Sequence, residues 1–313
     1  MSEADKIAYV FPGQGSQFPG MGKDLYERFP AARAIFDEAD AVLKFPLSKL
    51  CFEGPEEELR LTINAQPALV TTSIACLKAI QEHAGVKFKP AAFVAGHSLG
   101  EYSALIASGA TDFATGVYLA RERGRLMHEA GMAAPGGMAA ILGMNELLVT
   151  ELAALTHTFV ANINCPGQYV ISGAREDIEK AVETAKARGA VRAIPLQVSG
   201  AFHSPLMKPA QEGLAKILAR VKFNNPEVPV IANTSAEPLT QAEQIAPELT
   251  RQLLNGVLWQ HSIENMLKLG TGSFVEIGPG KVLAGLIKRI KRDVDILNVG
   301  DVQAIEEIAS RPA

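Results

Sequence analysis

Residues 91–108, AAFVAGHSLGEYSALIAS, decide how the rest of this chain is interpreted. The apolar run 91–95 predicts a buried strand, and the apolar residues between Leu99 and Ile106 follow helical spacing. Between them stands Gly96-His97-Ser98-Leu99-Gly100, a G-x-S-x-G sequence. Strand, G-x-S-x-G and helix in this order are the context of a nucleophile elbow. The stretch therefore predicts an α/β fold in which Ser98 is the nucleophile.

The residue types of this turn have a physical explanation. A turn that sharp needs Gly96 and Gly100, because a β-carbon at either position would collide with neighbouring backbone. The Ser98 hydroxyl would lie beside the first free N–H groups of a helix, whose positive end favours a developing oxyanion. A Gly-bounded turn with an ordinary N-capping serine is the alternative that the pattern leaves open.

Composition indicates a soluble globular protein. The 313 residues are 48% hydrophobic and 20% charged, enough for a sizeable core and unlike a disordered chain. A formal net charge of −4 argues against bulk electrostatic binding to nucleic acid. The three cysteines, Cys51, Cys76 and Cys165, are odd in number and widely spaced, which suits a reducing compartment without disulfides or a zinc site.

Targeting and membrane signals are not expected either. The first residues, MSEADKIAYVF, lack the basic region and apolar core of a signal peptide. The longest weakly polar stretch, 131–144, is glycine-rich and too short to span a bilayer. We therefore predict a cytoplasmic protein with no membrane partner.

The order of expected elements indicates two parts. A first strand at 6–11 precedes a mostly helical region, 25–84, with breaks near Pro46 and Pro55. After the elbow and a helix over 112–130, the pattern changes. It predicts a strand at 138–144, a helix at 146–155, a hairpin of strands 159–164 and 168–172, a helix at 175–188 and a strand at 191–198. The order βαββαβ is that of a ferredoxin-like subdomain.

We therefore expect a large α/β-hydrolase-like domain with a parallel sheet, made of residues 1–130 and 200–313, and an inserted ferredoxin-like subdomain of residues 131–199. The large domain would be completed by a helix to about residue 221, a strand at 228–233 and a helix at 247–254. A strand at 274–277 and a basic helix after Gly280 would follow. The active site would lie in the cleft between the two parts.

One arginine stands out in the helix over 112–130. At about 100° per residue, the apolar side chains of this helix share one broad arc, with Arg121 and Arg125 on the opposite side. Arg123 projects into the apolar arc, four residues after Leu119 and four before Met127. A guanidinium there is costly unless an anion or a hydrogen-bond network compensates it. A structural salt bridge would also explain it.

Several motifs resemble one family over nearly the whole chain. They are GHSLGEYSAL from Gly96, FPGQGSQFPGMG from Phe11, NAQPAL from Asn64, RERG from Arg121, GAFHS from Gly200 and EIGPGKVL from Glu276. Together they resemble the malonyl-CoA:acyl carrier protein transacylases and the related acyltransferase domains of fatty-acid and polyketide synthases. The resemblance implies that the corresponding arginine, Arg123, binds the carboxylate of a malonyl group, a task suited to a planar guanidinium fork.

A general base is expected at His203. Four of the six histidines have charged or polar surroundings, and the side chain of His97 would leave the elbow in a different direction from Ser98. His203 stands at the junction of the two expected parts, just before Ser204-Pro205, a good helix start. The resemblance implies that His203 is the base and that the main-chain carbonyl of Gln252 orients it. No Asp or Glu stands out as a third triad member.

The resemblance also implies the remaining site residues. The backbone N–H groups of Leu99 and Gln14 would form the oxyanion hole. Phe202 would crowd the space that an α-methyl group needs, which favours malonyl over methylmalonyl groups. Asn162 and Asn164 would line the substrate cleft, although an asparagine in a tight hairpin is commonly structural. Gln66 would approach the site, although helix capping and packing would also explain it.

The implied reaction is malonyl transfer from malonyl-CoA, through a malonyl ester of Ser98, to the phosphopantetheine thiol of acyl carrier protein. No metal and no permanently bound cofactor are expected, coenzyme A entering only as a thioester substrate. We expect a monomer whose partners are malonyl-CoA and the acidic carrier protein. A basic docking patch on and after the helix that follows Gly280 is the candidate surface: Lys281, Lys288, Arg289, Lys291 and Arg292. An ordinary solvated helix face would also explain these charges.

Two other functions fit parts of the pattern. A serine hydrolase or thioesterase would use the same elbow and base, but it would not need a cation in the acyl pocket. A non-catalytic scaffold could keep the fold in order to bind carrier proteins. The presence of Ser98, His203, Arg123 and Gln14 together argues against a scaffold.

Overall fold

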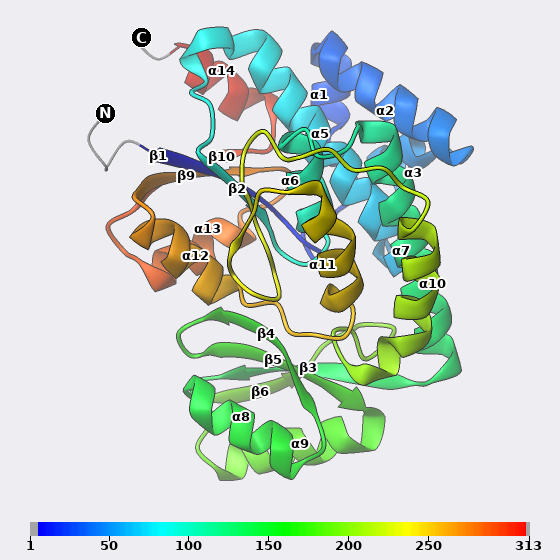
Figure 1. Ribbon diagram of the computed structural model, residues 1–313, viewed down its shortest axis with the longest axis vertical. Coiled ribbons are helices and arrows are strands. Elements are labelled where there is room, and N and C mark those ends of the chain that lie inside the picture. Colours follow the sequence, from blue (N-terminus) through cyan, green and yellow to red (C-terminus); the bar gives the residue numbers. More distant parts are fainter. Residues whose placement is uncertain (1–5, 311–313) are drawn as a thin grey trace.

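Two β-sheets, one above the other in Figure 1, organise the computed structural model, which describes residues 6–310. The larger sheet has six strands in the order β10-β9-β1-β2-β7-β8. All neighbouring pairs are parallel except β7 and β8. Its strands are β1 (Lys6–Phe11), β2 (Phe93–Gly96), β7 (Val230–Ile231), β8 (Pro238–Leu239), β9 (Thr271–Ile277) and β10 (Asp295–Val299). The parallel sheet expected from the sequence is confirmed.

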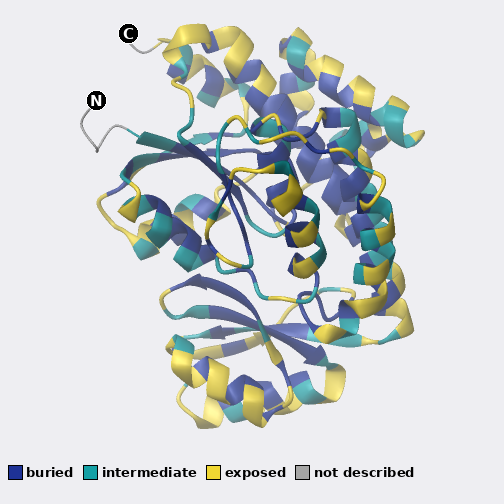
Figure 2. Ribbon diagram, viewed as in Figure 1, coloured by how far each residue is buried: buried dark blue, intermediate teal, exposed yellow. Residues whose placement is uncertain are grey.

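Helices cover both faces of this sheet, as parallel strands with continuous apolar sequences require. The N-terminal half supplies α1 (Lys23–Arg28), α2 (Pro30–Leu43), α3 (Leu47–Glu53), α4 (Glu56–Arg60), α5 (Thr62–Ala84), α6 (Gly100–Ala107) and α7 (Phe113–Ala133). The C-terminal half supplies α10 (Lys208–Leu218), α11 (Ile245–Gln252), α12 (Trp259–Lys268), α13 (Val282–Ile290) and α14 (Val302–Ser310). Figure 2 shows that α5 is buried over most of its length, and it packs against α7.

The second sheet is antiparallel, in the order β4-β5-β3-β6. In chain order its elements are β3 (Gly136–Leu142), α8 (Glu146–Leu155), β4 (Phe159–Cys165), β5 (Gln168–Ala174), α9 (Arg175–Ala187) and β6 (Arg192–Pro195). The two helices cover one face of the sheet, on the side away from the larger sheet (Figure 1). This is the predicted βαββαβ ferredoxin-like arrangement.

Some elements differ from their predicted extent. Strand β6 ends at Pro195 rather than at residue 198, and β7 pairs over only two residues of the apolar run 228–233. The strand ends at Ile231, and two residues later the side chain of Asn233 forms two hydrogen bonds with the elbow. Helices α12 and α14 and strand β10 have no counterpart in the sequence prediction.

The cysteines and the helices can be compared with what the composition predicts. Cys51, Cys76 and Cys165 are free and buried. Across residues 6–310, each helix falls short of the length and apolar character needed to span a bilayer.

Candidate active site

The turn between β2 and α6 is the predicted nucleophile elbow. Ser98 has a positive φ of 50°, a conformation that non-glycine residues rarely adopt. A β-carbon on Gly96 would lie 1.9 Å from the carbonyl carbon of Gly100, and one on Gly100 would lie 2.2 Å from the carbonyl oxygen of Phe11. Both positions therefore require glycine. The turn is sharp enough to leave the Ser98 side chain at its apex.

The side chains of Ser98 and His203 are hydrogen-bonded across 105 residues of sequence. Ser98 Oγ lies 2.8 Å from His203 Nε2, and His203 Nδ1 lies 2.8 Å from the main-chain oxygen of Gln252. A carbonyl oxygen only accepts, so Nδ1 carries the proton and donates it. In the neutral imidazole Nε2 is then the acceptor for the Ser98 hydroxyl. This is the alignment in which an imidazole can remove a proton from serine.

His203 is held in an unusual backbone conformation on the loop that leads into α10. Its φ is 57°, also in the left-handed region, and such strain concentrates at functional positions. The next residue anchors the turn, because Ser204 Oγ donates to Ala201 O at 2.6 Å and accepts from Leu206 N at 3.3 Å. Ser204 thus caps the following turn as its sequence predicts.

The surroundings keep the imidazole of His203 neutral. Burial, followed by the positive charge of Arg123, lowers the pKa of His203 to about 3. The carbonyl of Gln252 works in the opposite direction, because it stabilises the protonated form. A neutral imidazole is the form that can accept a proton.

Arg123 is buried, with 1% of its surface exposed, which confirms that it projects into the core side of α7. Its Nη2 donates to Ser98 Oγ at 3.1 Å and to Gln252 Oε1 at 2.8 Å. Its Nη1 donates to Gln66 Oε1 at 2.7 Å. Buried Nε has no hydrogen-bond partner within residues 6–310.

The charge of Arg123 has no direct counter-ion in the part of the chain that the structure describes. None of the salt bridges within residues 6–310 includes this guanidinium, whereas Arg125, two residues later, pairs with Glu122 and Glu129 on the helix surface. Burial lowers the pKa of Arg123, and nearby Tyr102 and Glu101 oppose the shift. A buried cation held by amide oxygens and carrying an unused N–H is suited to receive an anion.

A hydrogen-bond chain joins Arg123 to the loop after β1. Gln66, which accepts from Arg123, donates through Nε2 to Thr62 Oγ1 at 2.8 Å. Thr62 Oγ1 in turn donates to Gln14 Oε1 at 2.9 Å. The structure therefore brings Gln66 as well as Gln14 to the site, as the sequence motifs imply.

Two backbone N–H groups that border the elbow, those of Leu99 and Gln14, are the ones expected to form an oxyanion hole. Leu99 follows the nucleophile at the start of α6, and Gln14 lies on the loop after β1. This loop is held against the elbow by a hydrogen bond from His97 N to Phe11 O at 3.1 Å. Within residues 6–310, neither the N–H of Leu99 nor that of Gln14 donates to a protein group.

These side chains open into a cavity of about 570 Å³ between the two sheets. Gln14, Ser98, Leu99, Arg123 and His203 all line it. The opposite wall comes from the second sheet and its exit loop and includes Met138, Asn162, the segment 196–198 and Phe202. Phe202 is 5% exposed and lies directly before His203 in the chain. The expected cleft between the two parts is present.

Asn164 is not brought to this cavity, in contrast to the expectation that it lines the cleft. Its side-chain oxygen lies 2.8 Å from His97 Nε2, and the His97 ring packs on Trp259 at 5.6 Å between centroids. The pairing of β4 is irregular near this point, which shifts the direction of its side chains. Asn162 does line the cavity.

Asn233 is a residue that the sequence analysis missed. Its Oδ1 accepts from Ser98 N at 2.7 Å and its Nδ2 donates to Gly96 O at 2.7 Å, so it holds both sides of the elbow. The only local signal is a polar residue at the end of an apolar run. Nothing in one sequence indicates that this run ends beside residue 98.

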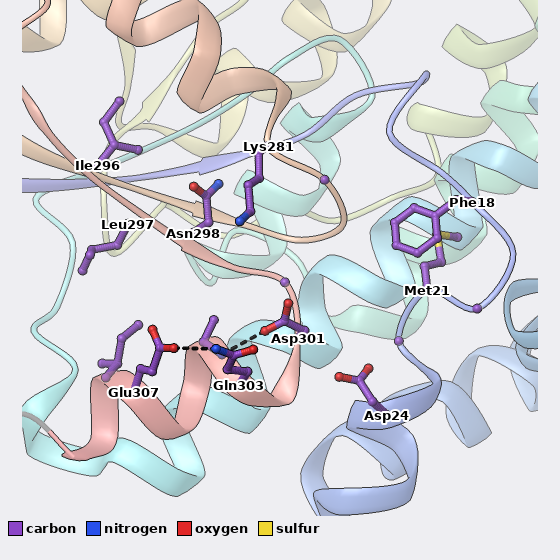
Figure 3. Close-up of a pocket in the computed structure, with 16 residues that line it drawn as sticks. Phe18, Met21, Asp24, Lys281, Ile296, Leu297, Asn298, Asp301, Gln303 and Glu307 are labelled. Carbon is purple, nitrogen blue, oxygen red and sulfur yellow. Dashed lines mark hydrogen bonds between the residues drawn. The ribbon is translucent and has the colours of Figure 1, made fainter.

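A larger cavity of about 680 Å³ lies elsewhere, between the loop after β1, the loop after β9 and α14 (Figure 3). None of the predicted site residues lines it. Its carboxylates serve the fold, because Asp24 accepts from Val302 N and Asp301 from Ala304 N. The chemistry is therefore assigned to the smaller cavity.

The geometry suits nucleophilic acyl transfer on a carbonyl whose acyl group carries a negative charge. It provides a serine with an aligned neutral imidazole, two free N–H groups and a buried guanidinium 3.1 Å from the hydroxyl. Residues 6–310 contain no cluster of three or more His, Cys, Asp or Glu side chains with the arrangement of a metal site.

Comparisons with known proteins agree with this chemistry. Residues 8–306 match the family model of the acyl transferase domain. The chain is 52% identical over 308 residues to the malonyl CoA-acyl carrier protein transacylase of Bacillus subtilis (strain 168), covering 96% of this chain and 95% of that protein.

Solved structures are similar over the same extent. The acyl-carrier-protein-S-malonyltransferase from Bartonella henselae matches with a TM-score of 0.92 and 44% identity, over 96% of this chain and 98% of that one. A malonyl-transacylase solved in complex with its type II PKS acyl-carrier protein matches with a TM-score of 0.92 and 41% identity, over 97% and 99% of the two chains.

The lowered pKa of His203 predicts how acylation of Ser98 depends on pH. With a pKa of about 3, only about 1% of the imidazole is protonated at pH 5, against about 97% for an ordinary histidine. Acylation by p-nitrophenyl acetate, whose acyl group has no titrating carboxylate, should therefore keep its rate within about twofold from pH 8 to pH 5. The burst of released nitrophenol, followed at the wavelength where its neutral and ionised forms absorb equally, measures this rate at each pH, and circular dichroism checks folding. A tenfold fall centred near pH 6.5 would contradict the prediction.

Proposed function

The chain belongs to the acyl transferase domain family, and from this premise we propose that it transfers a malonyl group from malonyl-CoA to the phosphopantetheine thiol of acyl carrier protein. One observation carries the choice of acyl group. Arg123 is a buried cation without a salt bridge within residues 6–310, and its Nη2 lies 3.1 Å from Ser98 Oγ. A single methylene separates the reacting carbonyl of a malonyl thioester from its carboxylate. A group that binds this carboxylate must therefore lie beside the nucleophile.

In the first half-reaction, His203 Nε2 takes the proton of Ser98 as Oγ bonds to the thioester carbonyl carbon. The N–H groups of Leu99 and Gln14 stabilise the oxyanion that forms on the carbonyl oxygen. When the carbon–sulfur bond breaks, the proton passes from His203 to the leaving thiolate of coenzyme A. A malonyl ester remains on Ser98, with its carboxylate held by Arg123.

In the second half-reaction the roles of the two sulfur compounds are reversed. His203 takes the proton of the carrier-protein thiol, and the sulfur attacks the ester carbonyl. As the carbon–oxygen bond breaks, Ser98 recovers the proton and malonyl-acyl carrier protein leaves. The two substrates therefore use one site in turn, a ping-pong cycle that supplies malonyl units for fatty acid synthesis. Coenzyme A acts only as part of a substrate.

Gln252 would orient both partners of the nucleophile, the imidazole of His203 and the guanidinium of Arg123. Its main-chain oxygen accepts from His203 Nδ1 and its side-chain oxygen from Arg123 Nη2, each at 2.8 Å. Asn164 would act on the site indirectly, by holding His97 of the elbow through a hydrogen bond.

The organisation of the chain into 1–130 with 200–313 and an inserted 131–199 is part of the proposal. It is supported by a separate hydrophobic core between the second sheet and its two helices. The cytoplasmic location and the monomeric state stay predictions from the sequence.

The decisive experiment is intact-protein mass spectrometry after mixing with malonyl-CoA. The wild type should gain one malonyl group and Ser98→Ala none. Arg123→Ala should load malonyl about 100-fold more slowly, because a buried carboxylate loses its charge partner, and react with p-nitrophenyl acetate within about tenfold of the wild type. If Arg123→Ala loads malonyl about as fast as the wild type, the serine hydrolase alternative is favoured, because a hydrolase needs no cation in the acyl pocket. If the wild type gains no adduct, the scaffold alternative is favoured.

Phe202 gives a separate prediction about the α-carbon of the acyl group. Its buried ring lines the cavity, so an α-methyl group should be crowded there. Loading from methylmalonyl-CoA should be about 10- to 100-fold slower than from malonyl-CoA, which is a common discrimination factor between substrates that differ by one methyl group. Phe202→Ala should narrow this ratio. Equal loading rates for the two thioesters in the wild type would contradict the proposal.

The carrier protein should dock on the basic patch of α13, although two of its residues are already engaged. Lys288 Nζ donates to the main-chain oxygens of Arg292 and Val294 at 3.2 and 2.6 Å. Arg289 donates to Gln168 Oε1 and Pro166 O at 2.6 and 3.2 Å, which braces α13 against the β4–β5 turn. The exposed cations Lys281 and Lys291 are therefore the better test of docking.

Charge reversal at Lys281 and Lys291 together should raise the KM for acyl carrier protein about tenfold at low salt, since acidic partners are steered by surface charge. Loading from malonyl-CoA should not change. Lys180→Glu with Arg188→Glu, on and just after α9, makes the same change of net charge and serves as the control. Equal KM values for the two double variants would reject the docking surface.

A further inference from the structure

Glu101 is a fully buried carboxylate three residues after the nucleophile, and the mechanism above does not use it. It lies in the first turn of α6. Its Oε1 accepts from Asn233 N at 3.0 Å, and its Oε2 accepts from Gln252 Nε2. Burial, and then the neighbouring carboxylate of Glu248, raises the pKa of Glu101 well above its usual value. The two N–H donors and Arg123 oppose that shift.

The amide of Gln252 stands between Glu101 and Arg123. Its Oε1 accepts from Arg123 Nη2 at 2.8 Å, while its Nε2 donates to Ser98 O at 2.9 Å and to Glu101. Both oxygens of Glu101 accept from N–H groups, which is the arrangement of an ionised carboxylate. Such a carboxylate can only accept, whereas a guanidinium can only donate. A rotated amide would place its NH₂ group against the guanidinium and its oxygen against the carboxylate. Glu101 and Arg123 together therefore hold the amide in one orientation.

This arrangement keeps the two charges close without joining them. Within residues 6–310 Arg123 and Glu101 form no salt bridge, and one amide group separates them. A direct ion pair would occupy the guanidinium and compete with the carboxylate of a substrate. With the negative charge one amide away, Arg123 is oriented and partly compensated, yet its Nε keeps a free N–H.

We propose that Glu101 is a positioning residue that fixes Arg123 through the side chain of Gln252 and so determines the preference for acyl groups that carry a carboxylate. The inference rests on the malonyl transfer proposed above. Glu101 touches neither substrate nor nucleophile in this scheme. Its effect reaches the carboxylate of the substrate through one amide and one guanidinium.

Glu101 has a second hydrogen bond, to the main chain of Asn233, and its loss would have a different consequence. Through the main-chain N–H of Asn233 it supports the residue whose side chain binds Ser98 N and Gly96 O. Losing that support would affect the elbow and hence every acyl donor alike. The effect through Gln252 and the effect through Asn233 can therefore be distinguished by comparing the acylation rates with a carboxylate-bearing acyl donor and with a neutral one.

The test is Glu101→Gln, which has almost the same shape but only one acceptor oxygen for two donors. Loading of Ser98 from malonyl-CoA should slow at least tenfold more than acylation by p-nitrophenyl acetate. The nitrophenolate burst amplitude reports the fraction of folded sites. Glu248→Gln is the matched control: this carboxylate is equally buried, but it binds Thr234 and Arg251 instead of Gln252. Its ratio of the two rates should stay within twofold of the wild type.

A double-mutant cycle shows whether Glu101 acts through the guanidinium. In an Arg123→Ala background, Glu101→Gln should change the ratio of the two rates less than twofold. If Glu101→Gln does not fold, Glu101→Asp keeps the charge but shortens its reach, and it should shift the ratio in the same direction.

Equal slowing of both donors, or an undiminished effect of Glu101→Gln without Arg123, would overturn the inference. A wild type that loads no malonyl group would instead overturn the proposed function.

Discussion

The burial of one guanidinium beside a serine hydroxyl constrains the whole site. Removing the charge of Arg123 from water is costly unless other groups compensate it. The chain does so with the amide oxygens of Gln66 on α5 and Gln252 at the end of α11, and with Ser98 Oγ at the elbow. Three segments far apart in the sequence must therefore meet at one side chain of α7. The packing of α5 against α7 brings Gln66 to this side chain, and the end of α11 brings Gln252.

The elbow imposes a second constraint, because its backbone is strained. Ser98 and His203 both have positive φ, so each needs fixed neighbours to hold it there. The side chain of Asn233 holds the backbone around Ser98 with two hydrogen bonds. The main-chain oxygen of Gln252 holds His203 by accepting a hydrogen bond from Nδ1. The strained residues are thus supported from the segment after β7 and from the end of α11. Gln14 lies on the loop after β1, the strand on the other side of β2 from β7.

Sequence reasoning recovered what local pattern encodes. The elbow follows from a strand, two glycines and a helix, and the burial of Arg123 from its phase on α7. The contacts of Gln252, Asn233 and Glu101 could not be derived from the residues alone, because they join distant segments through a carbonyl, a main-chain N–H and amide groups that every protein contains. Gln252 entered only through family resemblance. Of the two asparagines expected at the cleft, Asn162 lines the cavity and Asn164 does not, because irregular pairing in β4 changes the direction of its side chains.

The same constraint explains why a main-chain carbonyl, rather than a carboxylate, orients the imidazole. A carboxylate at the position of Gln252 O would raise the pKa of His203, since it would stabilise the imidazolium. The negative charge would also lie on the residue whose side-chain oxygen accepts from Arg123, and it would offset part of the positive charge that attracts the acyl carboxylate. A carbonyl holds Nδ1 without adding charge, at the cost of weaker electrostatic support for the imidazolium. Selecting a charged acyl group and activating the serine therefore favour the same uncharged partner.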